Sequence, residues 1–187
     1  AETLRQPMTR VLVLQFEATL HSLDLAFDRA RETTAHALQL IDEHQLQRAS
    51  GNFCWLHGRT LVEAGAVDAG LAMMREGRAQ QERFGLNYGL TRWFLSYAQA
   101  QLQWGDLVAA QVAVDEGVAL AEQGGELAVL PDLQLVKAAL HVANGQPEQA
   151  TECIESAVAL ARRQGAWTSE ESSMRAWVQL HGEHVPC

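Results

Sequence analysis

Histidine and cysteine are the residues of this chain that could do chemistry at neutral pH. The segment HGEHVPC places His181, His184 and Cys187 three residues apart. Imidazole and thiolate groups are common zinc ligands, so this spacing could bring three ligands to one ion. Gly182 and Pro186 break any helix that would align them, and the motif has no fourth ligand. We therefore expect no metal site in this segment.

The other two thiols, Cys54 and Cys153, lie far apart in the sequence and form no CxxC pair. Neither has a basic neighbour that would lower its pKa, so both are expected to pack as small hydrophobic side chains. Sparse, unpaired cysteines fit a reducing compartment, and we expect a cytoplasmic protein.

Catalytic motifs are missing from the rest of the sequence. The seven histidines form no HExxH pattern, so we interpret His57 and His141 as packing residues. We expect no enzyme activity, no catalytic residue and no cofactor. A small metal- or thiol-dependent enzyme is the weakest alternative that stays open.

Composition argues against two classes of partner. The 187 residues carry a net charge of −9 and a single lysine, Lys137, which disfavours binding to a phosphate backbone. Apolar runs such as VLVL at 11–14 are far shorter than the roughly 20 residues that cross a bilayer. We expect neither a nucleic-acid partner nor a membrane partner.

Glycines with a period of forty residues indicate the elements that position all these side chains. The two series are Gly65, Gly105, Gly145 and Gly85, Gly125, Gly165. Each glycine follows a stretch with helical apolar spacing, and glycine ends helices because it readily adopts the left-handed conformation. The pattern predicts two-helix repeats at 7–46, 47–86, 87–126 and 127–166, with helices of about 17 residues.

The predicted repeats differ at the two ends of the chain. The first repeat has Leu25 and Gln45 at the glycine positions, as expected of an atypical terminal repeat. After the fourth repeat we expect a capping helix at 167–182, with Thr168 and Glu171 as its capping box, and a tail at 183–187. Residues 1–187 are thus predicted to form a single all-α domain.

Two further residues fit helix starts inside the repeats. Asp106 is placed to cap the second helix of the third repeat, and Pro147 fits the first turn of the second helix of the fourth.

Small residues occupy the same forty-residue register. The three columns are Ala18, Gly58, Ala98, Ala138; Ala30, Gly70, Ala110, Ala150; and Ala37, Gly77, Gly117, Ala157. A glycine inside a helix costs about 1 kcal/mol relative to alanine, so these glycines need a compensating role. We expect neighbouring helices to approach closely at Gly77 and Gly117.

This spacing of small residues resembles the tetratricopeptide repeat, although that unit has about 34 residues. The longer unit looks like the helical repeats of bacterial signal-transduction ATPases, namely LuxR-type regulators related to the maltose activator and adenylate-cyclase-like proteins. The resemblance is carried by GRTLVEAGAVDAGLAMMREG, LSYAQAQLQWGDLVAAQVAVDEGVALAEQGGE and ESAVALARRQGA. It implies a right-handed superhelix that acts as a sensor or docking arm.

The resemblance also implies where a partner binds, because first helices line the concave side of tetratricopeptide-like stacks. The matching positions are Leu12, Gln15, Thr19; Asn52, Trp55, Arg59; Arg92, Leu95, Gln99; and Asp132, Leu135, Ala139. The second and third sets, Asn52 to Arg59 and Arg92 to Gln99, are the candidate binding residues, since their side chains can stack and form hydrogen bonds. Alternatively, Trp55 packs between repeats and the arginines are ordinary solvated charges.

These observations predict a non-catalytic sensor or scaffold domain from a larger bacterial transcriptional or signalling regulator. Its expected partner is a protein, a peptide or a small-molecule inducer. The alternative is a homo-oligomerising scaffold, in which an exposed apolar end or the ninth helix joins two chains as a homodimer.

Overall fold

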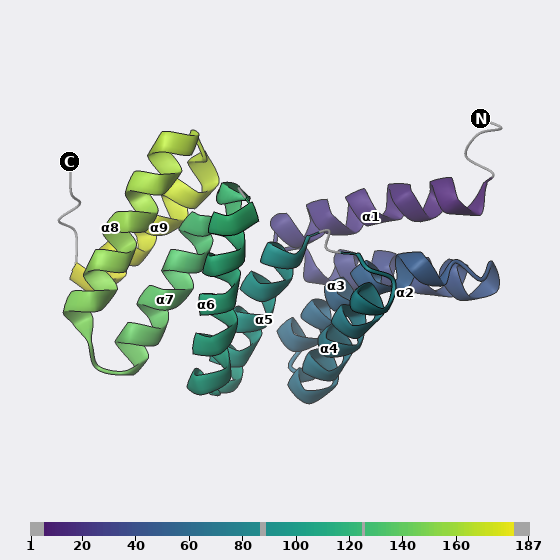
Figure 1. Cartoon of the computed structure of the whole chain (residues 1–187), viewed down its shortest axis with the longest axis horizontal. Helices are drawn as coiled ribbons and strands as arrows, with labels where there is room; N and C mark the ends of the chain where they lie inside the picture. The colour runs from purple at the N-terminus through teal and green to yellow at the C-terminus, as the bar shows by residue number, and fades with distance from the viewer. Residues whose placement is uncertain (1–5, 87–88, 125, 182–187) are drawn as a thin grey trace. The chain divides into compact units, whose positions relative to one another are not determined.

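The protein is all-helical, as the sequence predicts. The structure, a computed structural model, describes residues 6–86, 89–124 and 126–181 (Figure 1). Within these ranges it contains nine α-helices, two short 3₁₀ helices and no strand. None of the described helices combines the length and apolar character needed to cross a membrane. The chain divides into two compact units, Ala1–Tyr88 and Gly89–Cys187, close to the predicted border between the second and third repeats.

Unit 1 contains two helix pairs. Its helices are α1 (Pro7–Leu23), α2 (Phe27–Glu43), α3 (Ser50–Glu63) and α4 (Val67–Arg83), with the 3₁₀ helix η2 (Gln47–Ala49) before α3. Each helix packs against the next one, and α1 also contacts α3. Its apolar interior includes Phe53 of α3, which packs with Ala37 and Ile41 of α2.

Unit 2 contains two further pairs and a ninth helix. Its helices are α5 (Leu90–Trp104), α6 (Leu107–Gly124), α7 (Leu130–Ala143), α8 (Pro147–Gln164) and α9 (Trp167–His181), with the 3₁₀ helix η3 (Leu127–Val129) before α7. Sequential helices again pack together, and α9 contacts both α7 and α8. The predicted helix at 167–182 is therefore present over the described residues.

Helix boundaries recur every forty residues. The second helix of each pair begins at Phe27, Val67, Leu107 and Pro147. The described glycines of the two series, Gly65, Gly85, Gly105, Gly145 and Gly165, follow helix ends with φ between 63° and 89°. This confirms them as helix stops, whereas Gly125 lies outside the described residues.

Leu25 and Gln45 adopt the same left-handed conformation without being glycine. Their φ angles are 56° and 55°. The hydrogen bonds that close the turns are also the same: Ala26 N–H donates to His21 O at 2.8 Å, as Ala66 N–H donates to Leu61 O at 2.9 Å in the glycine turn after α3. The first repeat thus keeps the turn geometry of the others at a conformational cost.

Two of the three predicted helix starts are confirmed and one is wrong. Asp106 caps α6, since its Oδ1 accepts a hydrogen bond from Ala109 N–H at 2.9 Å. Pro147 is the first residue of α8. The capping box of Thr168 and Glu171 does not form, because α9 begins at Trp167, one residue before Thr168. The preceding turn at Gly165 starts the helix directly, with Ala166 O accepting from Glu170 N–H at 2.9 Å.

Glycines let α3 and α4 pack backbone against backbone. A Cβ atom added to Gly58 would lie 2.6 Å from Gly70 O, and one added to Gly77 would lie 2.5 Å from Gly51 O. Both distances are too short for a carbon atom, so the expected close approach at Gly77 is confirmed. At Gly117 the added atom would meet only side chains, 3.0 Å from Phe94 Cβ and 3.1 Å from Leu133 Cδ2. That contact is close, but it can relax more easily.

Candidate binding surface

The predicted residues Asn52 and Trp55 hold α3 in place within unit 1. Trp55 is buried, and its Nε1–H donates to Asn52 Oδ1 at 3.3 Å. The same oxygen accepts from Gln81 Nε2 of α4 at 2.6 Å. Because Trp55 is only 6% exposed, its position fits the packing interpretation better than direct contact with a partner.

The third member of this set, Arg59, contacts residues of α3 and α2 within unit 1. Its Nε and Nη2 both donate to Glu63 Oε1, at 2.9 and 2.6 Å. The guanidinium carbon also lies 5.7 Å from the centre of the Phe27 ring. Its charge is therefore balanced locally, through a partner four residues later that helical spacing in the sequence could have indicated.

The second predicted set, Arg92, Leu95 and Gln99, lies on α5 in unit 2 and is described separately. Leu95 is buried in the apolar core beside residues of α6 and α7. Arg92 and Gln99 are half-buried. Leu95 therefore stabilises the unit from inside.

Arg92 belongs to a polar cluster with Asp132 of α7 and Ser169 of α9. Burial raises the pKa of Asp132, while a hydrogen bond from Ser169 and the positive charge of Arg92 act in the opposite direction. The cluster joins three helices of unit 2, and we interpret it as an internal polar contact.

A surface groove of about 380 Å³ lies in unit 1. We call it the unit 1 groove. Its lining residues come from α1, η2, α3, α4 and the segment after α4: Met8, Leu12, Gln15, Phe16, Arg48, Ala49, Asn52, Gln81 and Leu86. The structure thus brings together Leu12, Gln15 and Asn52, three of the residues that the sequence places on the concave side.

Most of the groove lining was not identified from the sequence. Met8 and Phe16 are large apolar side chains that stay exposed, and this exposure has no local signature in the sequence. Arg48 is the charged residue of the lining, and its guanidinium carbon lies 5.5 Å from the centre of the Phe84 ring. The groove therefore combines apolar walls with one positive charge and the amides of Gln15, Asn52 and Gln81.

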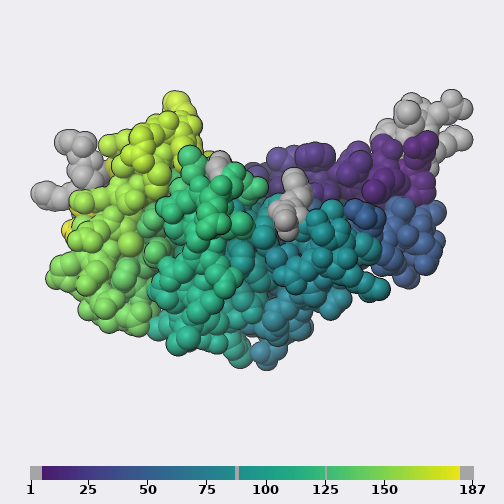
Figure 2. All heavy atoms as spheres, in the orientation of Figure 1, coloured from purple at the N-terminus to yellow at the C-terminus, as the bar shows by residue number. Residues whose placement is uncertain are grey.

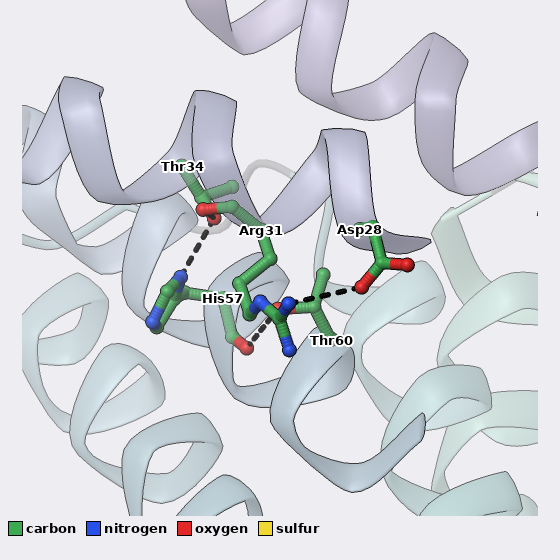
Figure 3. Close-up of polar contacts among 5 residues, drawn as sticks. All are labelled: Asp28, Arg31, Thr34, His57 and Thr60. Carbon is green, nitrogen blue, oxygen red and sulfur yellow. Dashed lines mark hydrogen bonds and ion pairs between the residues drawn. The ribbon is translucent and has the colours of Figure 1, made fainter. Parts of the chain in front are cut away.

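His57 links α2 to α3 (Figure 3). Its Nδ1 lies 2.7 Å from Thr34 Oγ1, and that hydroxyl also lies 2.8 Å from Ala30 O. The hydroxyl carries one proton, so the donor in the Thr34–His57 hydrogen bond depends on the imidazole tautomer.

Burial lowers the pKa of His57, and the positive charge of Arg31 lowers it further, against the opposing effect of a hydrogen bond to the Arg31 backbone. The Arg31 side chain itself pairs with Asp28 at 2.9 Å (Figure 3). His57 is therefore neutral at pH 7 and serves as a packing residue.

The two described thiols are poor nucleophiles, as expected. Burial raises the pKa of Cys54 to about 11, with a smaller contribution from the charge of Glu76. Burial also raises the pKa of Cys153, although Lys137 opposes this effect. Both thiols stay protonated at neutral pH.

No three histidine, cysteine or acidic side chains converge on a point that could hold a metal ion within the described part of the chain. His181 lies at the end of α9, with Nε2 2.8 Å from Thr151 Oγ1 and its ring 4.3 Å from the Trp177 ring. His184 and Cys187 lie outside the described residues, so the predicted absence of a metal site in the tail is untested.

No protein-family model matches this sequence, and no curated protein matches it either.

Proposed function

We propose that this chain is a tetratricopeptide-like repeat domain that binds a segment of a partner protein in the unit 1 groove. The second helices of the four helix pairs start forty residues apart, and this spacing supports a repeat architecture of the right-handed superhelical kind. The resemblance to regulator repeats supports a role as a non-catalytic sensor or scaffold within a larger bacterial transcriptional or signalling protein.

The observation that carries the proposal is the composition of the groove. Its volume of about 380 Å³ falls in the size range of binding pockets, and apolar side chains from α1 line it next to a few polar groups. An apolar anchor side chain would fill the space between Met8, Leu12 and Phe16. The Arg48 guanidinium would then grip a neighbouring carboxylate.

A protein segment fits better than a small inducer. Small-molecule sites bury most of their ligand, about 70–90% of its surface. In contrast, Leu12 is 47% exposed and Phe16 is 67% exposed. Such open apolar walls suit a partner that covers them from outside, as an amphipathic helix does.

A peptide-display selection against the full chain tests this function. We expect enrichment of amphipathic segments that carry a large apolar residue beside Asp or Glu. Calorimetry on an enriched peptide should then show that Leu12→Glu weakens binding at least tenfold, about 1.4 kcal/mol, because the new carboxylate repels the acidic residue beside the apolar anchor.

Val112→Glu on α6 is the matched control, since Val112 is also about half exposed and the charge change is the same. It should bind the peptide like the wild type. If nothing is enriched, or if Leu12→Glu binds as tightly as Val112→Glu, the groove is not the binding site.

A further inference from the structure

Helix α1 is apolar on nearly every side. Val11 and Ala18 are buried inside unit 1, yet Val13, Phe16 and Leu20 on another side of the helix are 49%, 67% and 60% exposed. In the space-filling view, α1 lies along one edge of the described part of unit 1 (Figure 2). A helix that is hydrophobic all round is normally buried, so this exposed side needs a partner.

The forty-residue register shows what kind of contact this side is built for. In α3 the equivalent positions are Phe53, Leu56 and Thr60, and in α7 they are Leu133, Val136 and Leu140; all six are buried. There they face the preceding second helix, because α3 packs against α2 and α7 packs against α6. The outer side of α1 is therefore a helix-packing face.

The spacing along this face is that of a coiled-coil seam. Residues Thr9, Val13, Phe16, Leu20 and Leu23 alternate steps of four and three, which is the a/d pattern of a heptad repeat. Arg10 and Glu17 lie seven residues apart along one edge of the seam. They carry opposite charges at equivalent flanking positions.

We propose that two copies of this chain form a dimer by pairing their α1 helices in antiparallel orientation. A two-fold axis between residues 14 and 15 places Val13 opposite Phe16 of the second copy and Leu20 opposite Thr9. When two helices pair in antiparallel orientation, the positions that flank the same edge of each seam lie next to each other. Arg10 of each copy therefore lies near Glu17 of the other. The helix thus matches itself in both apolar pattern and charge.

The described part of α9 is a poorer match for this face than a second α1. Val178 of α9 occupies the position of the small-residue column that begins with Ala18, and it lies near exposed Glu171 and Arg175. These two form an ion pair at 2.7 Å. Although Trp167 and Val178 are also exposed, covering this ion pair with apolar α1 would remove it from water, which disfavours head-to-tail association.

The available area fits a weak, reversible dimer. The four exposed apolar residues of the seam, which are Val13, Phe16, Leu20 and Leu23, are 49–67% exposed. They present roughly 400 Å² of apolar surface, taking about 170 Å² for a large side chain. Two copies would bury about 800 Å² of it, in the range of weak, transient complexes.

Sedimentation equilibrium on the full chain tests the dimer. Between about 5 and 200 µM, a micromolar dimer should raise the average mass from 20.6 kDa toward twice that value. The double variant Val13→Glu/Leu20→Glu should stay at the monomer mass. These two residues do not line the unit 1 groove, so peptide binding should persist and the two proposals can fail separately.

Val108→Glu/Val112→Glu on α6 is the matched control, because both residues are at least half exposed. It should dimerise like the wild type. A wild-type mass of 20.6 kDa at every concentration overturns the proposal. A dimer that Val13→Glu/Leu20→Glu leaves intact overturns it as well.

A charge swap tests the antiparallel orientation. Arg10→Glu and Glu17→Arg should each weaken the dimer several-fold, whereas the double exchange should restore it, because each copy again faces an opposite charge. Glu17 Oε1 also lies 3.6 Å from His21 Nε2, so changing Glu17 removes a contact within the helix as well. Recovery of the dimer in the double exchange is therefore more informative than its loss in either single variant. A double exchange as weak as the single variants would overturn this orientation.

Discussion

Replacing Leu25 by glycine should give a more stable protein than replacing it by alanine. Leu25 follows α1 with φ of 56°, a conformation that costs a residue with a Cβ atom about 1–2 kcal/mol. Glycine removes this strain, but it loses about 0.5–1 kcal/mol more backbone entropy on folding. Alanine keeps the strain and removes the same side-chain contacts. We therefore expect Leu25→Gly to exceed Leu25→Ala in free energy of unfolding by about 0.5–1 kcal/mol.

The alanine variant is needed because Leu25 is 71% exposed, so nearly a third of the residue is still covered and both changes lose that contact. The reverse change, Gly65→Ala, isolates the same conformational term. Gly65 has φ of 85°, and no atom beyond its two chain neighbours lies within 4 Å of an added Cβ. It should lower the free energy of unfolding by about the same 0.5–1 kcal/mol.

Urea denaturation followed by far-ultraviolet circular dichroism measures all three variants. Leu25→Gly being no more stable than Leu25→Ala, or Gly65→Ala matching the wild type, would refute this prediction. Either result would mean that the turn relaxes away from the left-handed conformation at little cost.

Gly77→Ala should destabilise by roughly 1–3 kcal/mol in urea denaturation and more than Gly117→Ala, because the new methyl meets backbone at Gly77 and side chains at Gly117; equal effects would contradict this. Cys54, with a pKa of about 11, should react with iodoacetamide at pH 7 about 100-fold more slowly than an ordinary thiol, measured by mass spectrometry with a cysteine peptide as the reference. His57 has a lowered pKa, so the unfolded chain binds its proton first. Stability from His57 is complete above about pH 6.5 and is lost as pH falls through the folded pKa. His57→Gln should reduce this loss, and an unchanged pH profile of the denaturation midpoint would refute the assignment.

Features encoded by neighbouring residues could be predicted from the sequence. Helix ends at Gly65 and Gly105 follow from the conformational freedom of glycine, and the cap at Asp106 depends on an N–H group three residues away. The predicted capping box at Thr168 does not form because another local feature takes its place. The turn at Gly165 already starts the helix at Trp167.

Contacts between helices decide whether each side chain is buried in the core or exposed on the surface. Trp55 looked like a binding residue, but packing buries it and its indole bonds Asn52, which in turn bonds Gln81, 29 residues away on α4. Phe16 carries the same apolar character as Leu56, its equivalent on α3. One is exposed and the other buried, because α2 covers α3 whereas the outer side of α1 is uncovered. Periodicity and turn residues along the chain determined where helices begin and end. Which apolar faces are left open depends on which helices lie beside them, and only the tertiary structure decides that.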